Sequence, residues 1–198
     1  SLTPIKPKWK NAKKTTVFVP IEQVQKKDYY IASIGQTQLW VLSQSKEGSI
    51  AYNMPMSLSL KGEYEIDILR KAIFQVIKKH EILRTVFDIT SEGKVIQIVR
   101  EPESINYHIH FNNVIEDQKP EHIVESYIEA DSYKPFDLKN GPLLRVCLFQ
   151  ISKDNFILYF NMHHIISDGW SMKILKEEVM NYYDAFKNDE EITLTLLP

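Results

Sequence analysis

The stretch of this sequence best suited to chemistry is NMHHIISDGWSM, residues 161–172, in which two adjacent histidines precede an aspartate and a glycine. Histidine is the side chain most easily tuned to exchange a proton near neutral pH, so His163 or His164 could act as a base. Asp168 could pair with a cation and lock the turn, and Gly169 could let a substrate approach the backbone closely. The short pattern HxxxD is a weak signal, whereas the string HHIISDGWS is much more specific.

A metal centre is the competing interpretation of the paired histidines. They end the apolar run NFILYFNM, which predicts a buried strand, and successive side chains on a strand point to opposite faces. Only one of the two could therefore face a given pocket, and no third ligand stands at a recognisable spacing. His108 and His110 share a face of another predicted strand, where a solvated surface is the better interpretation because no cysteine or carboxylate pattern accompanies them. The sequence favours a proton-exchanging histidine and predicts no metal site.

The elements that must position these residues follow from hydrophobic periodicity. Residues 141–151 and 155–164 are apolar on both faces and predict two strands buried on both sides, joined by the turn SKD. Helices and strands alternate elsewhere, and strands also form hairpins, so we predict an α/β fold, a two-layer sandwich of helices on a mixed β-sheet. The predicted helices are a short one opened by a Ser33–Gln36 capping box, 65–79, 120–131 and 171–186, and the other predicted strands are 51–62, 83–89, 94–99 and 107–111.

Composition and charge exclude several classes of protein. The chain has 198 residues, 43% of them hydrophobic, which suits one soluble globular domain. A formal net charge of −2 gives no reason to expect nucleic-acid or membrane binding, and no run of 18 apolar residues could form a transmembrane helix. The single cysteine, Cys147, lies in the apolar run LLRVCLF, which excludes a disulfide framework and favours a buried hydrophobe over a nucleophile. We therefore expect a cytoplasmic protein.

Three stretches, taken in order, resemble the signature motifs of condensation domains from nonribosomal peptide synthetases. Residues 33–42, SIGQTQLWVL, resemble the first motif, a serine followed by Ala-Gln and then Arg-Leu-Trp. Residues 79–87, KHEILRTVF, resemble the second motif, Arg-His-Glu-x-Leu-Arg-Thr-x-Phe, and residues 162–171 carry HHxxxDG. The phrases AYNMP and PFDLKNGPLLR are also typical of the family.

The chain departs from the family pattern at a few positions. Gly35 stands where alanine is usual, Thr37-Gln38 precede Leu-Trp, and Lys79 replaces the arginine that opens the second motif. Lys79 keeps the positive charge but lacks the planar fork of a guanidinium, which argues against a bidentate pairing with Asp168. Arg84, which matches the motif, is therefore the expected partner of Asp168, and a solvated charge on a strand is the alternative for Arg84.

The resemblance implies a fold like that of chloramphenicol acetyltransferase, in which a complete condensation domain is two such halves arranged as a V-shaped pseudo-dimer. We therefore expect residues 1–28 to be a linker or lead-in segment. Residues 29–198 are expected to be the N-terminal subdomain of a condensation domain, with the C-terminal subdomain absent from this chain.

The resemblance also implies an activity, the formation of an amide bond between a donor acyl or peptidyl thioester and an acceptor aminoacyl thioester. Phosphopantetheine arms of carrier domains hold both substrates, so the domain is expected to have no intrinsic cofactor. The expected partners are the donor and acceptor carrier domains, the C-terminal condensation subdomain and the adenylation domain of the same synthetase, with neither nucleic acid nor membrane.

The family also implies roles for the residues of the opening stretch. His164 is the catalytic histidine, which either takes a proton from the attacking amine or orients the amine and stabilises developing charge. His163 should point away into packing or a hydrogen bond. Asp168 should be a structural brace, because a carboxylate paired with arginine stays ionised, and the Gly169 N–H could contact the tetrahedral intermediate.

Other functions share parts of this pattern. An acyltransferase that uses soluble coenzyme A has the same HxxxDG motif, and an epimerisation domain is a close relative. The chain by itself is expected to be inactive, because near-attack geometry needs both walls of the tunnel, and it could act only as a structural or interaction unit. Turnover with carrier-bound donors, compared with soluble acyl-coenzyme A, separates the two enzyme functions.

Overall fold

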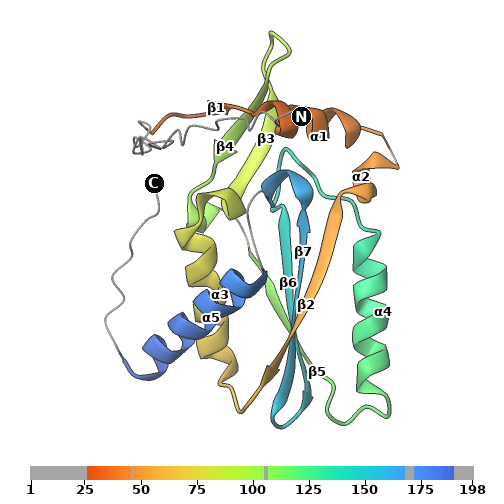
Figure 1. The fold of residues 1–198 in the computed structure, drawn as a ribbon, viewed down its shortest axis with the longest axis vertical. Coiled ribbons are helices and arrows are strands. Elements are labelled where there is room, and N and C mark those ends of the chain that lie inside the picture. Colours follow the sequence, from red (N-terminus) through yellow and green to blue (C-terminus); the bar gives the residue numbers. More distant parts are fainter. Residues whose placement is uncertain (1–25, 46, 105–106, 168–171, 190–198) are drawn as a thin grey trace, which may run out of the picture.

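The computed structural model describes residues 26–189 apart from 46, 105–106 and 168–171, and its largest element is a four-stranded sheet. The strand order is β2 (Asn53–Lys61), β7 (Asn155–His163), β6 (Leu144–Ser152) and β5 (Ile109–Asn113). β7 pairs antiparallel with both β2 and β6, whereas β5 pairs parallel with β6. The sheet is mixed and carries helices, which confirms the predicted α/β class (Figure 1).

Helices cover both faces of this sheet because its central strands are apolar on both faces. The three long helices are α3 (Ile66–Lys79), α4 (Pro120–Ser132) and α5 (Met172–Lys187). Leu158 and Phe160 of β7 share a core with residues of α3 and α5, whereas Tyr159 packs in a second apolar cluster with residues of α4. Figure 1 accordingly shows α3 and α5 on one side of the sheet and α4 on the other. Because successive side chains of β7 point to opposite faces, this one strand contributes side chains to both cores.

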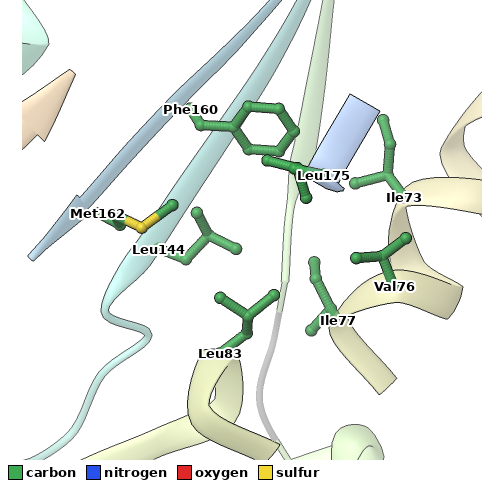
Figure 2. Close-up of a pocket in the computed structure, with 8 residues that line it drawn as sticks. All are labelled: Ile73, Val76, Ile77, Leu83, Leu144, Phe160, Met162 and Leu175. Carbon is green, nitrogen blue, oxygen red and sulfur yellow. The ribbon is translucent and has the colours of Figure 1, made fainter. Parts of the chain in front are cut away.

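The core between α3, α5 and the sheet encloses one small void. Figure 2 shows that the void is lined by Ile73, Val76, Ile77, Leu83, Leu144, Phe160, Met162 and Leu175. Its volume is about 10 Å³, roughly the space that one water molecule needs. All of the lining side chains are apolar, so this void is a packing feature of the core and offers nothing to bind a polar substrate.

A smaller antiparallel sheet lies beside the helix that carries the first motif. Its strand order is β1 (Tyr30–Ile31), β4 (Val95–Val99) and β3 (Thr85–Ile89), and the β3–β4 pair confirms the predicted hairpin. Helix α1 (Ile34–Leu42) begins with the predicted capping box, because Ser33 Oγ accepts from the Gln36 N–H at 3.2 Å and the Gln36 side chain accepts from the Ser33 N–H at 2.8 Å. No residue of α1 is buried, and a short helix, α2 (Gly48–Ala51), follows it.

Most predicted elements are confirmed, but some of their boundaries were wrong. Leu83 and Arg84 were placed in a strand and instead lie in a 3₁₀ turn, η1 (Glu81–Arg84), since the Leu83 N–H donates to the His80 carbonyl at 3.1 Å. The strand predicted at 107–111 is β5, two residues further along the chain. Cys147 is buried in β6, and burial raises its pKa to about 11, as expected for an unreactive thiol. No described helix is both long and apolar enough to cross a bilayer.

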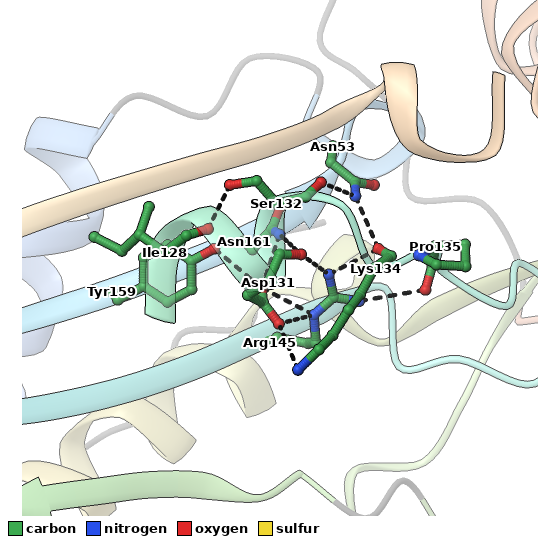
Figure 3. A network of polar contacts seen from close by, with 9 residues as sticks. All are labelled: Asn53, Ile128, Asp131, Ser132, Lys134, Pro135, Arg145, Tyr159 and Asn161. Atoms are coloured by element: carbon green, nitrogen blue, oxygen red, sulfur yellow. Dashed lines mark hydrogen bonds and ion pairs between the residues drawn. The ribbon is translucent and has the colours of Figure 1, made fainter. Parts of the chain in front are cut away.

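A buried carboxylate ties the end of α4 to the two central strands. Asp131 is 2% exposed and pairs with the guanidinium of Arg145, with 2.9 Å between Arg145 Nε and Asp131 Oδ1. The Tyr159 hydroxyl donates to Asp131 Oδ2 at 3.0 Å, and Asn161 Nδ2 donates to the same oxygen at 2.8 Å (Figure 3). Arg145 Nη2 also donates to the Lys134 carbonyl at 3.0 Å. A buried charge is tolerated only when it is paired and hydrogen-bonded, and this network supplies both.

We predict that Tyr159→Phe lowers the free energy of unfolding by about 1.5–3 kcal/mol, the usual contribution of a hydrogen bond to a charged group. Urea denaturation of the wild type and of Tyr159→Phe measures this loss. Tyr133→Phe is the matched control, since Tyr133 is 68% exposed and its hydroxyl should change stability by less than about 0.5 kcal/mol. Equal stabilities of the Tyr159 and Tyr133 variants would contradict the assigned role of the network.

Candidate active site

The two histidines of HHIISDG lie where the chain leaves the central sheet. His163 is the last residue of β7 and is 1% exposed, whereas His164 is exposed and begins a 3₁₀ turn, η3 (His164–Ile166). The sequence predicted that alternation along one strand separates the two side chains. That reason was wrong, because only His163 belongs to the strand, but the separation itself is confirmed. One imidazole packs inside the protein and the other faces solvent.

The turn that carries His164 is fixed on several sides. The His163 N–H donates to the Leu143 carbonyl at 3.0 Å, and the His164 N–H donates to the Tyr52 carbonyl at 2.9 Å. Ile165 and Ile166 are 1% and 0% exposed and belong to the main core. Helix α1 also packs against η3. The exposed imidazole therefore projects from a backbone that has little freedom to move.

Both ring nitrogens of His163 have partners inside the protein. The Ile165 N–H donates to His163 Nδ1 at 3.1 Å, and His163 Nε2 lies 3.1 Å from the hydroxyl of Ser43, the residue that follows α1. Because a backbone N–H can only donate, Nδ1 carries a lone pair and the proton is on Nε2. Burial, with a smaller contribution from the neighbouring His164, lowers the pKa of His163 to about 4. His163 is therefore neutral near pH 7, and its side chain points into packing and hydrogen bonds, the orientation that was expected for it.

The imidazole of His164 lies within hydrogen-bond distance of the Ser167 side chain. Ser167 Oγ lies 3.0 Å from His164 Nδ1 and donates to the His164 carbonyl at 2.9 Å. Neither Ser43 nor Ser167 was predicted from the sequence as part of the site. Ser167 could have been found, because a 3₁₀ turn brings residues i and i+3 together.

The alternative considered for Arg84, a solvated charge on a strand, was wrong. Its side chain is buried in η1, where Nη1 donates to the Arg100 carbonyl at 2.7 Å and Nη2 lies 3.4 Å from Glu81 Oε1. The buried Nε has no hydrogen-bond partner within the residues that the structure describes. The expected partner Asp168 and its neighbour Gly169 lie outside those residues, so the Arg84–Asp168 pair remains a prediction.

Lys79 forms an ion pair with a residue of α5. Its ammonium lies 2.7 Å from Glu178 Oε1 of α5, and His80 Nε2 lies 2.5 Å from Glu178 Oε2. Burial by itself would raise the pKa of Glu178, but the hydrogen bonds from Lys79 and His80 lower that pKa below its ordinary value. The second motif therefore joins α3 to α5 through its first two residues.

The other histidine pair lies at the start of β5 (Ile109–Asn113), which includes His110 and is directly preceded by His108. His108 and His110 are both exposed, and their ring centroids are 6.1 Å apart. Their predicted exposure is confirmed, but the strand predicted to carry both was wrong at its start, because His108 precedes β5. Within the described ranges, no three His, Cys, Asp or Glu side chains are grouped so that they could hold a metal ion.

Comparison with known proteins identifies the family. The model of the family described as "Condensation domain" matches residues 26–197. The chain belongs to the condensation domain family. The resemblance drawn from the three motifs to condensation domains of nonribosomal peptide synthetases is thus confirmed.

Curated relatives are large synthases. The chain is 36% identical to bacitracin synthase 2 of Bacillus licheniformis over 83% of the chain and 6% of that protein. It is 32% identical to chondramide synthase of Chondromyces crocatus over 93% of the chain and 5% of that protein. The condensation domain described here thus corresponds to a small part of each of these relatives.

Solved structures share the fold. The starter condensation domain of rhizomide synthetase superposes with a TM-score of 0.76 at 23% identity, over 84% of this chain and 40% of that chain. The first condensation domain of the calcium-dependent antibiotic synthetase gives a TM-score of 0.77 at 20% identity, over 83% of this chain and 39% of that chain. The chain thus spans about two fifths of these solved chains, and the likeness confirms the predicted chloramphenicol acetyltransferase-like architecture.

We predict that His163 makes the fold sensitive to acid. Its pKa is about 4 in the folded chain and about 6.5 when unfolded, so the unfolded state binds more protons between these values. This contribution to stability is complete above pH 6.5 and is lost as the pH falls towards 4, by about 3 kcal/mol in total. Denaturation of the wild type and His163→Gln at pH 7 and pH 4 measures it.

The His163→Gln variant should lose about 3 kcal/mol less than the wild type between these two pH values, because glutamine does not titrate. His122→Gln is the matched control for the loss of one histidine, since His122 is exposed on α4. A wild-type pH dependence equal to that of His163→Gln would show that His163 already accepts its proton in the folded state.

Proposed function

We propose that this chain supplies the histidine side of a condensation active site, in which an amine attacks an acyl thioester and an amide bond forms. The observation that carries the proposal is the exposed imidazole of His164 on a turn whose next two residues are buried in the core. A proton-transfer group must be reachable by the substrate and held in place, and His164 meets both requirements. Membership of the condensation domain family supports the choice of reaction.

The proposed substrates are held by other domains. Donor and acceptor are thioesters on the phosphopantetheine arms of carrier domains, and an adenylation domain of the same synthetase supplies the acceptor. Residues 29–198 are the N-terminal subdomain in this proposal, and a C-terminal condensation subdomain provides the opposite wall of the site. The 40% share of the solved starter condensation domain that the chain covers supports this division. The reaction involves no redox step and needs no cofactor of the domain's own.

In the proposed step, the lone pair of the acceptor amine attacks the thioester carbonyl carbon of the donor. The new C–N bond forms as the carbonyl oxygen takes up charge, and the C–S bond then breaks. The proton that the amine loses passes to His164 and finally to the departing sulfur, so the products are an amide and a free thiol. His163, Arg84 and Asp168 hold the turn in this proposal, and the Gly169 N–H lies near the developing oxyanion.

We predict that His164→Ala, made in the complete condensation domain, lowers the rate of amide formation about 10²–10⁴-fold, the usual contribution of a positioned proton-transfer group. Peptide formation from carrier-loaded donor and acceptor, followed by mass spectrometry, measures this loss. The melting temperature should hardly change, because the side chain is exposed. His110→Ala, at another exposed histidine, should keep normal turnover. Near-normal turnover by His164→Ala would overturn the catalytic assignment.

The same assay distinguishes the alternative functions. An acyltransferase that uses soluble coenzyme A would transfer the acyl group from acyl-coenzyme A without a carrier domain. A structural half-domain would give no turnover in either format, even when completed by its second subdomain. Comparison of this chain alone with the complete domain shows how much of the activity depends on the opposite wall.

We predict that Asp168 and Arg84 act as one structural pair. Asp168→Ala should lower the melting temperature as well as the activity, and the Asp168→Ala and Arg84→Met effects on unfolding should couple by about 0.5–3 kcal/mol in a double-mutant cycle. Lys79→Met is the control and should be additive with Asp168→Ala, since Lys79 pairs with Glu178. Lost activity with an unchanged melting temperature in Asp168→Ala would instead assign Asp168 a chemical role.

A further inference from the structure

Ser167 is held against two atoms of His164. Its hydroxyl oxygen lies 2.9 Å from the His164 carbonyl oxygen and 3.0 Å from His164 Nδ1. The Ser167 N–H also donates to the same carbonyl, at 3.1 Å. Ser167 itself is only 9% exposed.

The two contacts of the Ser167 hydroxyl determine where the proton of the neutral imidazole lies. A serine hydroxyl has one proton to donate and can accept through its lone pairs, whereas a carbonyl oxygen can only accept. The 2.9 Å contact is therefore a hydrogen bond only if Ser167 donates its proton to the carbonyl. Its oxygen then accepts from the imidazole, which requires a proton on Nδ1. With the hydroxyl proton directed at Nδ1 instead, two oxygen lone pairs would face each other at 2.9 Å.

We propose that Ser167 is a positioning residue that holds His164 as the Nδ1–H tautomer and leaves the Nε2 lone pair for the substrate. The catalytic consequence rests on the function proposed for His164, whereas the tautomer itself does not. The two adjacent histidines are then opposite tautomers, since His163 has its proton on Nε2 and accepts at Nδ1 from the Ile165 N–H. His163 thus donates from Nε2 to the Ser43 hydroxyl, whereas Nε2 of His164 can accept a proton.

This arrangement meets the requirement of the proton-accepting role that the sequence leaves open for His164, since a base must present a lone pair to the amine. A histidine with a free Nε2 lone pair accepts the proton of the attacking amine directly. The Nδ1–H stays hydrogen-bonded to Ser167 Oγ during the proton transfer. The dipole of the Ser167 hydroxyl therefore stabilises the positive charge of the imidazolium. Without the hydroxyl, no described side chain selects a tautomer of His164, and part of the population would have its proton on the nitrogen that should accept one.

Nuclear magnetic resonance of the ¹⁵N-labelled chain tests the tautomer without any substrate. Two-bond ¹⁵N–¹H correlation spectra at pH 8 distinguish a protonated ring nitrogen from an unprotonated one, and His164→Asn assigns the signals by their loss. We expect wild-type His164 to be protonated at Nδ1 and His163 at Nε2. Ser167→Ala should convert His164 to a mixture of tautomers, and Ser167→Thr, which keeps the hydroxyl, should restore the wild-type pattern.

Ser104→Ala is the matched control. Ser104 also ends a 3₁₀ turn, η2 (Pro102–Ser104), and donates from its N–H and its hydroxyl to the Glu101 carbonyl, at 3.0 and 2.7 Å. It therefore makes the same two contacts to a backbone carbonyl as Ser167, but this carbonyl belongs to Glu101 and not to a histidine, so its loss should leave the spectrum of His164 unchanged. A wild-type His164 protonated at Nε2, or a Ser167→Ala spectrum equal to that of the wild type, would overturn the proposal.

The activity of the complete domain provides the second readout. Ser167→Ala should lower kcat about three- to tenfold with little change in KM, as expected from one neutral hydrogen bond that selects the reactive form. Ser167→Thr should recover most of this loss, and unchanged kcat in Ser167→Ala would overturn the positioning role. Full activity of His164→Ala would overturn the proposed function instead, while the spectra would still decide whether Ser167 sets the tautomer.

Discussion

Strand β7 is hydrogen-bonded along both of its edges and packed on both of its faces, and this constraint determines much of what surrounds it. It pairs with β2 and β6, and every side chain from Leu158 to His163 is buried. A polar side chain in such a strand must be neutral or fully partnered. Asn161 therefore reaches the Asp131 carboxylate, and His163 is neutral with a partner on each ring nitrogen. His164 is the first side chain after the strand that reaches solvent.

The Asp131 network and the candidate active site share a side chain. The Arg145 guanidinium lies over the ring of Phe136, 3.8 Å from its centroid, and the same ring meets the imidazole of His163 edge-on at 6.2 Å. Asn53, which pairs with His163 across β2 and β7, donates to the carbonyls of Ser132 and Lys134 (Figure 3). A buried ion pair contributes little net stability because desolvation offsets attraction. The Asp131–Arg145 pair instead fixes the position of Phe136, whose ring packs against the imidazole of His163.

The sequence was sufficient to predict those elements that depend on a local residue pattern. Periodicity located the central strands and long helices, and the Ser33–Gln36 spacing located the start of α1. Contacts between distant segments were not predictable in the same way. The Ser43–His163 bond joins residues 120 positions apart, and β1 is a two-residue strand without any periodicity to detect. Arg84 was expected in a strand because its neighbours favour strands, but the hydrogen bonds of η1 decide the local conformation.

The buried isoleucines of η3 have a consequence for the entropy of the reaction proposed for His164. Fixing one residue's backbone costs about 1–2 kcal/mol at room temperature. Because Ile165 and Ile166 are held in the core and the His164 N–H is bonded to Tyr52, the backbone of this turn is already ordered when the chain folds. In the function proposed for His164, a substrate therefore does not have to order that segment. In the proposed reaction, the same apolar packing that stabilises the fold thus lowers the entropic barrier at the exposed histidine.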